Sequence, residues 1–183
     1  MLILNGIDMG IEYETKVLDI DVDAIEQRLR ELNAKQEGEF LMRRWVYDID
    51  PENEEWIRLR EEGEKTTITY KRRTGTGIGE TEEIETEVDE FDTIAEILSK
   101  IPFKGNYYQE NKRKVYKLGS ITITIDSWPM IPTYLEIEGE SEEDVRKGLE
   151  LLGLTGKDVG NLSVKKVYSI YGIDLHEFKE LRF

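Results

Sequence analysis

Apolar and polar residues alternate along several short segments of the chain, and this two-residue period is typical of β-strands with two different faces. Residues 11–20 (IEYETKVLDI) show the pattern first, and residues 66–72 (TTITYKR) have strong β propensity. The same features predict six further strands, over residues 40–47, 55–60, 82–88, 107–118, 120–126 and 133–139. Gly or Pro residues separate most of these segments, so the sequence predicts about eight strands.

Amphipathic periodicity and capping residues predict helices in the remaining segments. These cover residues 22–34, 91–100, 142–152 and 164–171, and a short helix is expected from residue 175 onward. Asp21, Ser141 and Ser163 can cap helix N-termini. Because the helices lie between and after the strands, we expect an α+β fold: a closed eight-stranded antiparallel β tunnel, a barrel, with flanking helices. No linker and no fixed repeat is visible, so residues 1–183 are expected to form a single domain.

Several predicted strands carry like charges two positions apart, so that both charges share one face of the strand. The pairs are acidic in Glu12-Tyr13-Glu14, Glu85-Thr86-Glu87 and Glu136-Ile137-Glu138, and basic in Arg58-Leu59-Arg60. Further charges on or beside these strands are Lys16, Lys71, Arg113 and Asp126. The apolar residues alternate with these charges, so the charged faces are distinct from the apolar faces.

Two interpretations of the charged faces compete. In the first, they face solvent and the apolar faces form the core, which is the commoner arrangement for a single antiparallel strand. In the second, they converge inside a barrel whose outer apolar faces are covered by helices. Like charges two residues apart repel on an open surface, which favours the second interpretation. Paired carboxylates suit Mg²⁺ or Mn²⁺, and paired arginines match phosphate oxygens.

Composition narrows the classes of function. Charged residues make up 36% of the chain, well above the usual quarter, and the formal net charge is −15. An acidic surface without a basic run repels nucleic acid and anionic membranes, so neither partner is expected. The absence of Cys removes disulfides, thiolate nucleophiles and Cys-based zinc sites, and the single His, His176, is expected at the surface. No signal pattern or long apolar stretch is visible, so a cytoplasmic protein is expected.

The ordered set of charged motifs resembles a known family. Glu12-Tyr13-Glu14-Thr15-Lys16 is similar to the ExExK signature of the CYTH domain, whose members are also called triphosphate tunnel metalloenzymes. The resemblance spans about residues 11–139 and continues through Arg58-x-Arg60, Lys71, Glu85-x-Glu87, Arg113-x-x-Tyr116, Asp126 and Glu136-x-Glu138. The superfamily includes class IV adenylyl cyclases, thiamine triphosphatases and inorganic triphosphatases.

This resemblance implies roles for the matching positions. The catalytic cations that bind the triphosphate would be Lys16, Arg58, Arg60, Lys71 and Arg113. The ligands of a divalent metal, Mg²⁺ or Mn²⁺, would be Glu12, Glu14, Asp126, Glu136 and Glu138. Glu85 and Glu87 would belong to the substrate-binding tunnel, where they would orient the cations or hold a second metal.

The leading expectation is a metal-dependent triphosphatase that acts on inorganic tripolyphosphate or a small organic triphosphate. Within enzymes, the alternative is a class IV adenylyl cyclase that converts ATP to cyclic AMP and pyrophosphate. Outside enzymes, the alternative is a non-catalytic module that binds polyphosphate or nucleotides. The simplest interpretation is an acidic β-barrel whose charges only keep it soluble. The sequence leaves open which triphosphate is bound, and whether the protein forms a homodimer.

Overall fold

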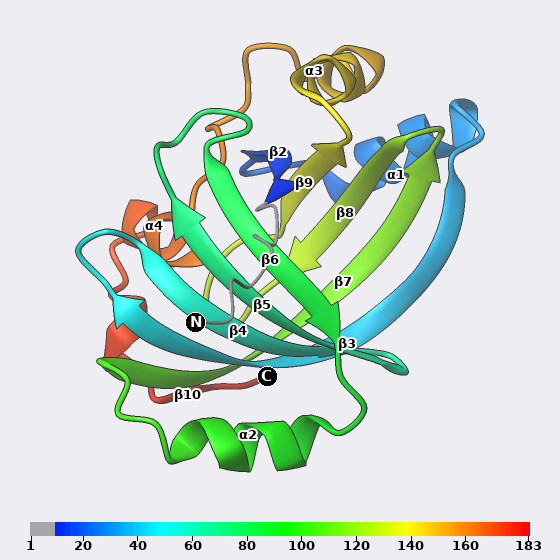
Figure 1. Ribbon diagram of the computed structural model, residues 1–183. Helices are drawn as coiled ribbons and strands as arrows, with labels where there is room; N and C mark the ends of the chain where they lie inside the picture. Colours follow the sequence, from blue (N-terminus) through cyan, green and yellow to red (C-terminus); the bar gives the residue numbers. More distant parts are fainter. Residues whose placement is uncertain (1–9) are drawn as a thin grey trace, which may run out of the picture.

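The computed structural model describes residues 10–183, which form a strongly curved sheet flanked by helices (Figure 1). The strands are β1 (Gly10–Ile11), β2 (Tyr13–Val17), β3 (Lys35–Asp50), β4 (Glu55–Glu62), β5 (Lys65–Arg73), β6 (Thr81–Glu87), β7 (Gly105–Leu118), β8 (Ile121–Ser127), β9 (Tyr134–Gly139) and β10 (Glu180–Leu181). The helices are α1 (Val22–Glu31), α2 (Phe91–Ser99), α3 (Glu142–Leu151), α4 (Val164–Ile170) and the short 3₁₀-helix η1 (Leu175–Glu177). None of these helices has the length and apolar character needed to cross a bilayer.

The sheet closes on itself through its first two strands. Neighbouring strands follow the order β1-β6-β5-β4-β3-β7-β8-β9-β2. β1 pairs with β6 at one edge, β2 pairs with β9 at the other, and Glu12 alone separates β1 from β2. Residues 10–17 therefore serve both edges as one interrupted strand. Counted in this way the barrel has eight antiparallel strands, which confirms the expected tunnel, while β10 is a short addition that runs parallel to β7.

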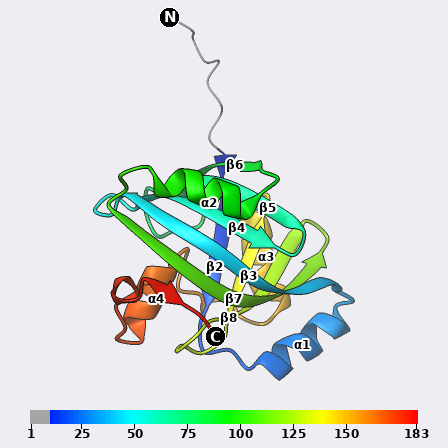
Figure 2. The same ribbon diagram turned by 90° about the horizontal axis from the view of Figure 1, so that it is seen from below.

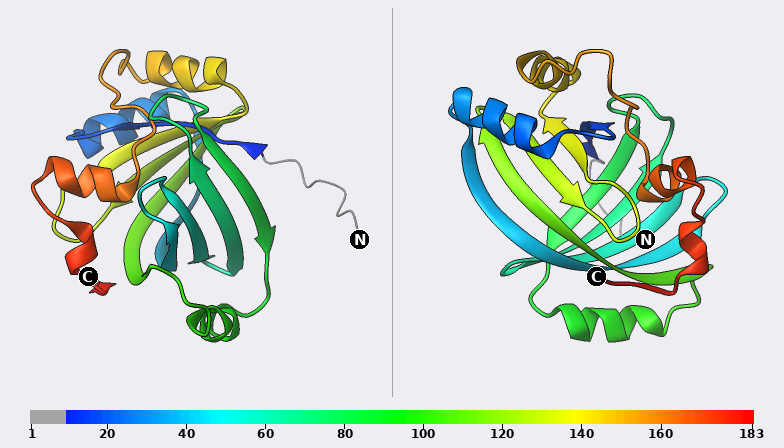
Figure 3. Two further views of the ribbon diagram at one scale, coloured as in Figure 1. Left: turned by 60° about the vertical axis from the view of Figure 1, so that its left-hand side comes forward. Right: turned by 180° about the vertical axis from the view of Figure 1, so that it is seen from behind.

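Helices cover the apolar outer faces of the barrel (Figures 1 and 3). α1 and α3 share a core with β2, β8 and β9, in which Leu29 and Val145 are fully buried. α2 lies on the other side of the barrel, where Phe91 and Leu98 pack against β3 and β4 (Figure 2). α4 and η1 form a third cluster near one end of the barrel, around the buried Tyr168. Because the outer faces are covered in this way, the inner faces are left for polar side chains.

The helix boundaries follow from local capping. The side chains of Asp21, Ser141 and Ser163 each accept a hydrogen bond from the backbone N–H three residues later, at 3.1, 3.2 and 3.4 Å. α1 ends at Glu31, earlier than expected, because the chain turns through Asn33, which has a left-handed φ of 56°. β3 is longer than expected, since it pairs with β7 along most of its length.

An irregular segment between α3 and α4, residues 158–163, crosses one end of the barrel. The backbone N–H of Lys16 donates to the carbonyl of Gly160 at 3.1 Å, and the N–H of Asn161 donates to the carbonyl of Thr76 at 2.9 Å. Gly160 has a φ of 76°, and a side chain there would collide with the Thr76 carbonyl. These contacts hold the start of α4 beside the opening of the barrel.

Candidate functional site

The barrel encloses a cavity of about 300 Å³ whose wall carries charged side chains of both signs. Side chains alternate along each strand, so every second residue of β4 from Trp56 to Glu62 lines the cavity. The residues between them, such as Ile57 and Leu59, pack outward near α2. The same alternation in the other strands brings charges that are far apart in the sequence into one enclosed space.

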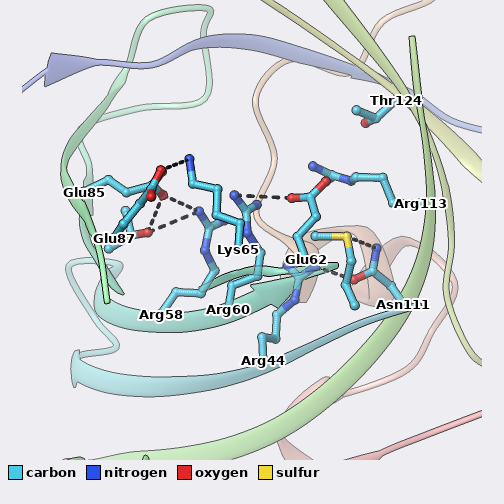
Figure 4. A network of polar contacts seen from close by, with 12 residues as sticks. Arg44, Arg58, Arg60, Glu62, Lys65, Glu85, Glu87, Asn111, Arg113 and Thr124 are labelled. Carbon is cyan, nitrogen blue, oxygen red and sulfur yellow. Dashed lines mark hydrogen bonds and ion pairs between the residues drawn. The ribbon is translucent and has the colours of Figure 1, made fainter. Parts of the chain in front are cut away.

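Four of the five arginines that line this cavity form one cluster: Arg44 from β3, Arg58 and Arg60 from β4, and Arg113 from β7 (Figure 4). Burial and then repulsion from neighbouring guanidinium groups lower the pKa of Arg44 to about 9 and that of Arg60 to about 10. With these pKa values, Arg44 and Arg60 still carry their charge at neutral pH. Like charges held this close and this deep need an anion to stabilise them.

Arg113 pairs with Asp126 and Glu136, but the other three arginines of the cluster have few anionic partners. The ion pair between Arg58 and Glu85 is long, at 3.5 Å. Within residues 10–183 Arg44 forms no ion pair with a carboxylate, and its guanidinium donates to Oδ1 of Asn111. The Nε atoms of Arg44 and Arg58 are buried without a hydrogen-bond partner. Unsatisfied guanidinium donors with excess positive charge match an anion that presents several oxygens, such as a polyphosphate.

Four glutamates lie on the opposite wall, at the junction of β1 and β2 and on β9: Glu12, Glu14, Glu136 and Glu138. Lys16 and Lys71 lie among them. Nζ of Lys16 is 2.7 Å from Glu14 and 3.1 Å from Glu136, and Nζ of Lys71 pairs with Glu12. With the lysines in these positions, no three acidic or histidine residues of the described chain converge on a single ligand point.

The carboxylate cluster still lacks positive charge. Burial, followed by repulsion from Glu12 and Glu136, raises the pKa of Glu14 to about 7. Burial alone would also raise the pKa of Glu136, but Lys16 and Arg113 outweigh it and hold that pKa below its ordinary value. One oxygen of Glu12, Oε2, is buried without a hydrogen-bond partner. Oxygen donors of this kind are the ligands that a divalent cation such as Mg²⁺ or Mn²⁺ prefers, so the donor chemistry of this cluster suits such a cation.

Asp126 lies on the inner face of β8 opposite Arg113 of β7, and it anchors the arginines from beneath the side chains that line the cavity. It is fully buried, and its Oδ1 accepts hydrogen bonds from Nε of Arg113 and Nδ2 of Asn111, both at 2.8 Å. Its Oδ2 accepts from Nη2 of Arg113 at 2.8 Å and from Oγ1 of Thr124 at 2.9 Å. Because Asn111 in turn accepts from Arg44, one carboxylate fixes two cavity arginines, Arg113 directly and Arg44 through Asn111.

Most of the predicted site residues line this single cavity: Glu12, Glu14, Lys16, Arg58, Arg60, Lys71, Glu85, Arg113, Glu136 and Glu138. The structure does not bring the other two to the cavity wall. Both oxygens of Asp126 are taken by the hydrogen bonds just described. Glu87 is exposed near the end of β6 and pairs with Lys65 at 2.9 Å.

Sequence reasoning missed several cavity residues, among them Arg44, Arg73, Glu83 and His176. Arg73 lies two residues after Lys71, and Glu83 lies two residues before Glu85, so strand periodicity alone could have found both. His176 differs from its expected surface position, because η1 folds back over one end of the barrel and the half-buried imidazole lines the cavity. Only the tertiary placement of the C-terminal segment reveals this.

Several known proteins are similar to this chain in sequence or in fold. A relative from Methanocaldococcus jannaschii, described as a candidate adenylate cyclase, is 25% identical over 178 residues, covering 89% of this chain and 99% of the relative. A candidate adenylate cyclase from Vibrio parahaemolyticus has a similar structure, with a TM-score of 0.73 and 16% identity over 88% of this chain and 99% of that one. A candidate adenylyl cyclase from Hippeastrum, described as having a dominant triphosphatase activity, has a TM-score of 0.60 and 18% identity over 92% of this chain and 99% of that one.

The two structural likenesses are below 25% identity and show the shared fold. The CYTH domain family model matches residues 10–167, which include every strand that lines the cavity. On the strength of this match, the chain belongs to the CYTH domain family.

Proposed function

We propose that this protein is a divalent-metal-dependent hydrolase of triphosphates. The observation that carries the proposal is a pair of opposite charge deficits across one cavity. Arg44, Arg58 and Arg60 have more positive charge than their carboxylate partners balance, and the four carboxylates of the other cluster share only Lys16, Lys71 and Arg113. A triphosphate complexed with a divalent metal supplies both at once, because its oxygens meet the arginines while the metal meets the carboxylates.

In this proposal each cluster has a defined task. Arg44, Arg58, Arg60 and Arg113, with Lys16 and Lys71, bind the phosphate oxygens and hold the phosphate chain in line for attack. Glu12, Glu14, Glu136 and Glu138 hold Mg²⁺ or Mn²⁺, which offsets phosphate charge when bound. Asp126 is not a metal ligand in this proposal, and its task is to hold Arg113 in place.

The proposed hydrolysis breaks the terminal P–O bond of the triphosphate. Water attacks the terminal phosphorus and a cavity carboxylate accepts a proton from the water. The bond from this phosphorus to the bridging oxygen breaks, and the diphosphate leaves with that oxygen, which yields inorganic phosphate. The guanidinium groups stabilise the negative charge that develops on the leaving oxygen. They are preorganised for this because Asp126, Asn111 and Thr69 fix three of them before substrate binds.

A class IV adenylyl cyclase is the second candidate, and the relative from Methanocaldococcus jannaschii favours it. Cyclisation would use the same bound triphosphate, but the 3′-hydroxyl of the ribose would attack the α-phosphorus and release pyrophosphate. The two reactions differ in the group beyond the phosphates. A non-catalytic module would share the cavity and bind a triphosphate without turnover.

Product analysis separates these candidates. The purified protein is incubated with tripolyphosphate or with ATP, in the presence of Mg²⁺ or Mn²⁺. Release of inorganic phosphate supports the hydrolase, and cyclic AMP with pyrophosphate supports the cyclase. Binding without any product supports the non-catalytic module. If neither compound is bound or converted, the proposed function is wrong.

Glu12→Gln tests the carboxylate cluster. We expect the half-saturating concentration of Mg²⁺ to rise at least about tenfold, because the variant loses one charged oxygen ligand while keeping the size of the side chain. The measurement is the initial rate as a function of Mg²⁺ concentration. Glu82→Gln is the matched control, since Glu82 pairs with Arg72 outside the cavity. An unchanged Mg²⁺ dependence in Glu12→Gln would show that Glu12 is not a metal ligand.

A further inference from the structure

The cavity continues beyond the arginines toward α4 and η1, and the chemistry of its wall changes there. Asp48 of β3 lies four residues along the strand from Arg44, which is about 13 Å at the usual rise of a strand. Tyr107 of β7 and His176 of η1 line the cavity beside it. None of these three residues belongs to the proposed phosphate or metal sets, so this end of the cavity needs its own explanation.

Asp48 presents a carboxylate that no side chain or backbone donor satisfies within residues 10–183. The residue is 8% exposed and lines the cavity. Nε2 of His176 is 3.6 Å from its Oδ2, which is too long for a hydrogen bond. Burial raises the pKa of Asp48, as expected for a carboxylate with few donors around it. The oxygens of Asp48 are open to the cavity and free of donors from residues 10–183, so they can accept a hydrogen bond from a ligand bound there.

His176 is held firmly beside this carboxylate. Its ring stacks on Tyr107 with the centroids 4.5 Å apart and the planes inclined by 14°. Its backbone N–H donates to Oδ1 of Asp174, the N-cap of η1, at 3.0 Å. Burial and then the charge of Lys165 lower the pKa of His176, so the imidazole is neutral at neutral pH. A neutral imidazole offers one donor and one acceptor nitrogen to a ligand.

Lys165 also lines this end of the cavity, but a phosphate group does not suit direct contact with Asp48. An ionised phosphate has oxygens that accept hydrogen bonds and carry negative charge, and both properties oppose contact with Asp48. A hydroxyl or amino group can donate to Asp48 and exchange a second hydrogen bond with His176. The phosphate chain would therefore end at the arginines, and a different part of the ligand would reach Asp48.

We propose that Asp48 and His176 form a subsite for the hydroxyl- or amino-bearing organic part of the substrate, which makes the preferred substrate an organic triphosphate instead of inorganic tripolyphosphate. This inference rests on the proposed function, because the arginines must hold the phosphates for the organic part to reach Asp48. It adds to that function the choice of substrate class and the residues that make the choice.

The experiment compares kcat/KM for ATP and for tripolyphosphate, with Mg²⁺, in the unchanged protein and in Asp48→Asn. We expect the variant to lose about tenfold or more of kcat/KM for ATP, the size of one lost hydrogen bond to a charged group. Tripolyphosphate should be converted as well as before or better, because a repulsive charge is removed. Asp23→Asn, an exposed position on α1, is the control for the change in net charge.

Each outcome decides the inference. It is overturned if both substrates lose activity equally in Asp48→Asn, if neither loses any, or if the unchanged protein prefers tripolyphosphate to ATP. In the last case hydrolysis of tripolyphosphate still supports the proposed function, so the two failures are distinguishable. If the unchanged protein converts neither compound, calorimetry decides: weaker ATP binding in Asp48→Asn with unchanged tripolyphosphate binding supports the subsite, and equal ATP binding overturns it.

Discussion

Replacing Arg60 with Ala lowers kcat/KM for the triphosphate by about 10²- to 10³-fold, the usual effect of removing one preorganised donor from developing negative charge. Arg60 faces the cavity with Arg58 and Arg113, and its burial and then their charges lower its pKa. Its nearest carboxylate, Glu62, is 3.8 Å away. The guanidinium is therefore available to a bound phosphate. Steady-state kinetics with tripolyphosphate and with ATP measures the loss.

Arg43→Ala is the matched control for this variant. Arg43 lies on β3 next to Arg44 but points outward, where it binds Glu61 with both of its nitrogens Nε and Nη2, at 2.8 and 2.9 Å. Its replacement should leave kcat/KM within about twofold, since a partly exposed ion pair contributes little beyond local stability. Equal kinetic losses in Arg43→Ala and Arg60→Ala would contradict the assignment of the cavity arginines.

The stability of Arg60→Ala tests separately whether Arg60 has a functional or a structural role. Removing one of several crowded, buried like charges relieves repulsion, and the space left faces a polar cavity instead of an apolar core. We therefore expect the free energy of unfolding of Arg60→Ala to be unchanged or higher. A protein that loses activity without losing stability has lost a functional contact, since a structural contact would affect both.

The fold could be predicted because charged and apolar residues alternate along its strands and so distinguish the two faces of each strand. The alternation of charged and apolar residues through Arg58, Leu59 and Arg60 assigns one face to the cavity and one to the core under α2. The strand pairings that close the barrel could not be predicted from the sequence. It depends on Glu12 interrupting a strand that pairs with β6 on one side and β9 on the other, and both partners lie far away in the sequence.

Site residues could be predicted where their spacing within a single strand places them on the charged face. They could not be predicted where their position depends on the pairing of two strands or on a tertiary contact. Arg43 and Arg44 are adjacent arginines, and sequence gives no reason to turn the second one inward. Their orientation follows from the pairing of Arg44 with Arg60 across β3 and β4. Asp126 looks like any other tunnel carboxylate in the sequence. Its position beside Arg113 depends on the register of β7 against β8.

That position makes Asp126→Ala the most destabilising change we expect in this site. The variant leaves the buried Arg113 with only Glu136, at 3.1 Å, and removes the acceptor that orients Asn111. Losing one member of a buried ion pair costs about 3–5 kcal/mol of unfolding free energy. Urea denaturation measures the change. Asp92→Ala, which removes an exposed partner of Arg43, should cost less than about 1 kcal/mol.

A double variant tests whether the ion pair between Asp126 and Arg113 is the source of the lost stability. In Asp126→Leu/Arg113→Met the unpaired buried charge is removed along with its partner, so we expect the double variant to be more stable than Asp126→Ala. If instead the double variant is as unstable as the sum of its single changes, the ion pair is not the source of the cost.

Kinetics of Asp126→Asn decides between the two roles that Asp126 could have. A metal ligand and an anchor of arginines both reduce activity when lost, but they respond differently to added metal. If Asp126 holds Arg113 and Arg44, the variant binds the triphosphate more weakly, KM rises, and the half-saturating Mg²⁺ concentration stays close to that of the unchanged protein. If excess Mg²⁺ restores the rate, Asp126 contacts the metal and the hydrogen bonds to Arg113 and Asn111 are not its main task. Since both of its oxygens are already occupied by four donors, we expect the first result.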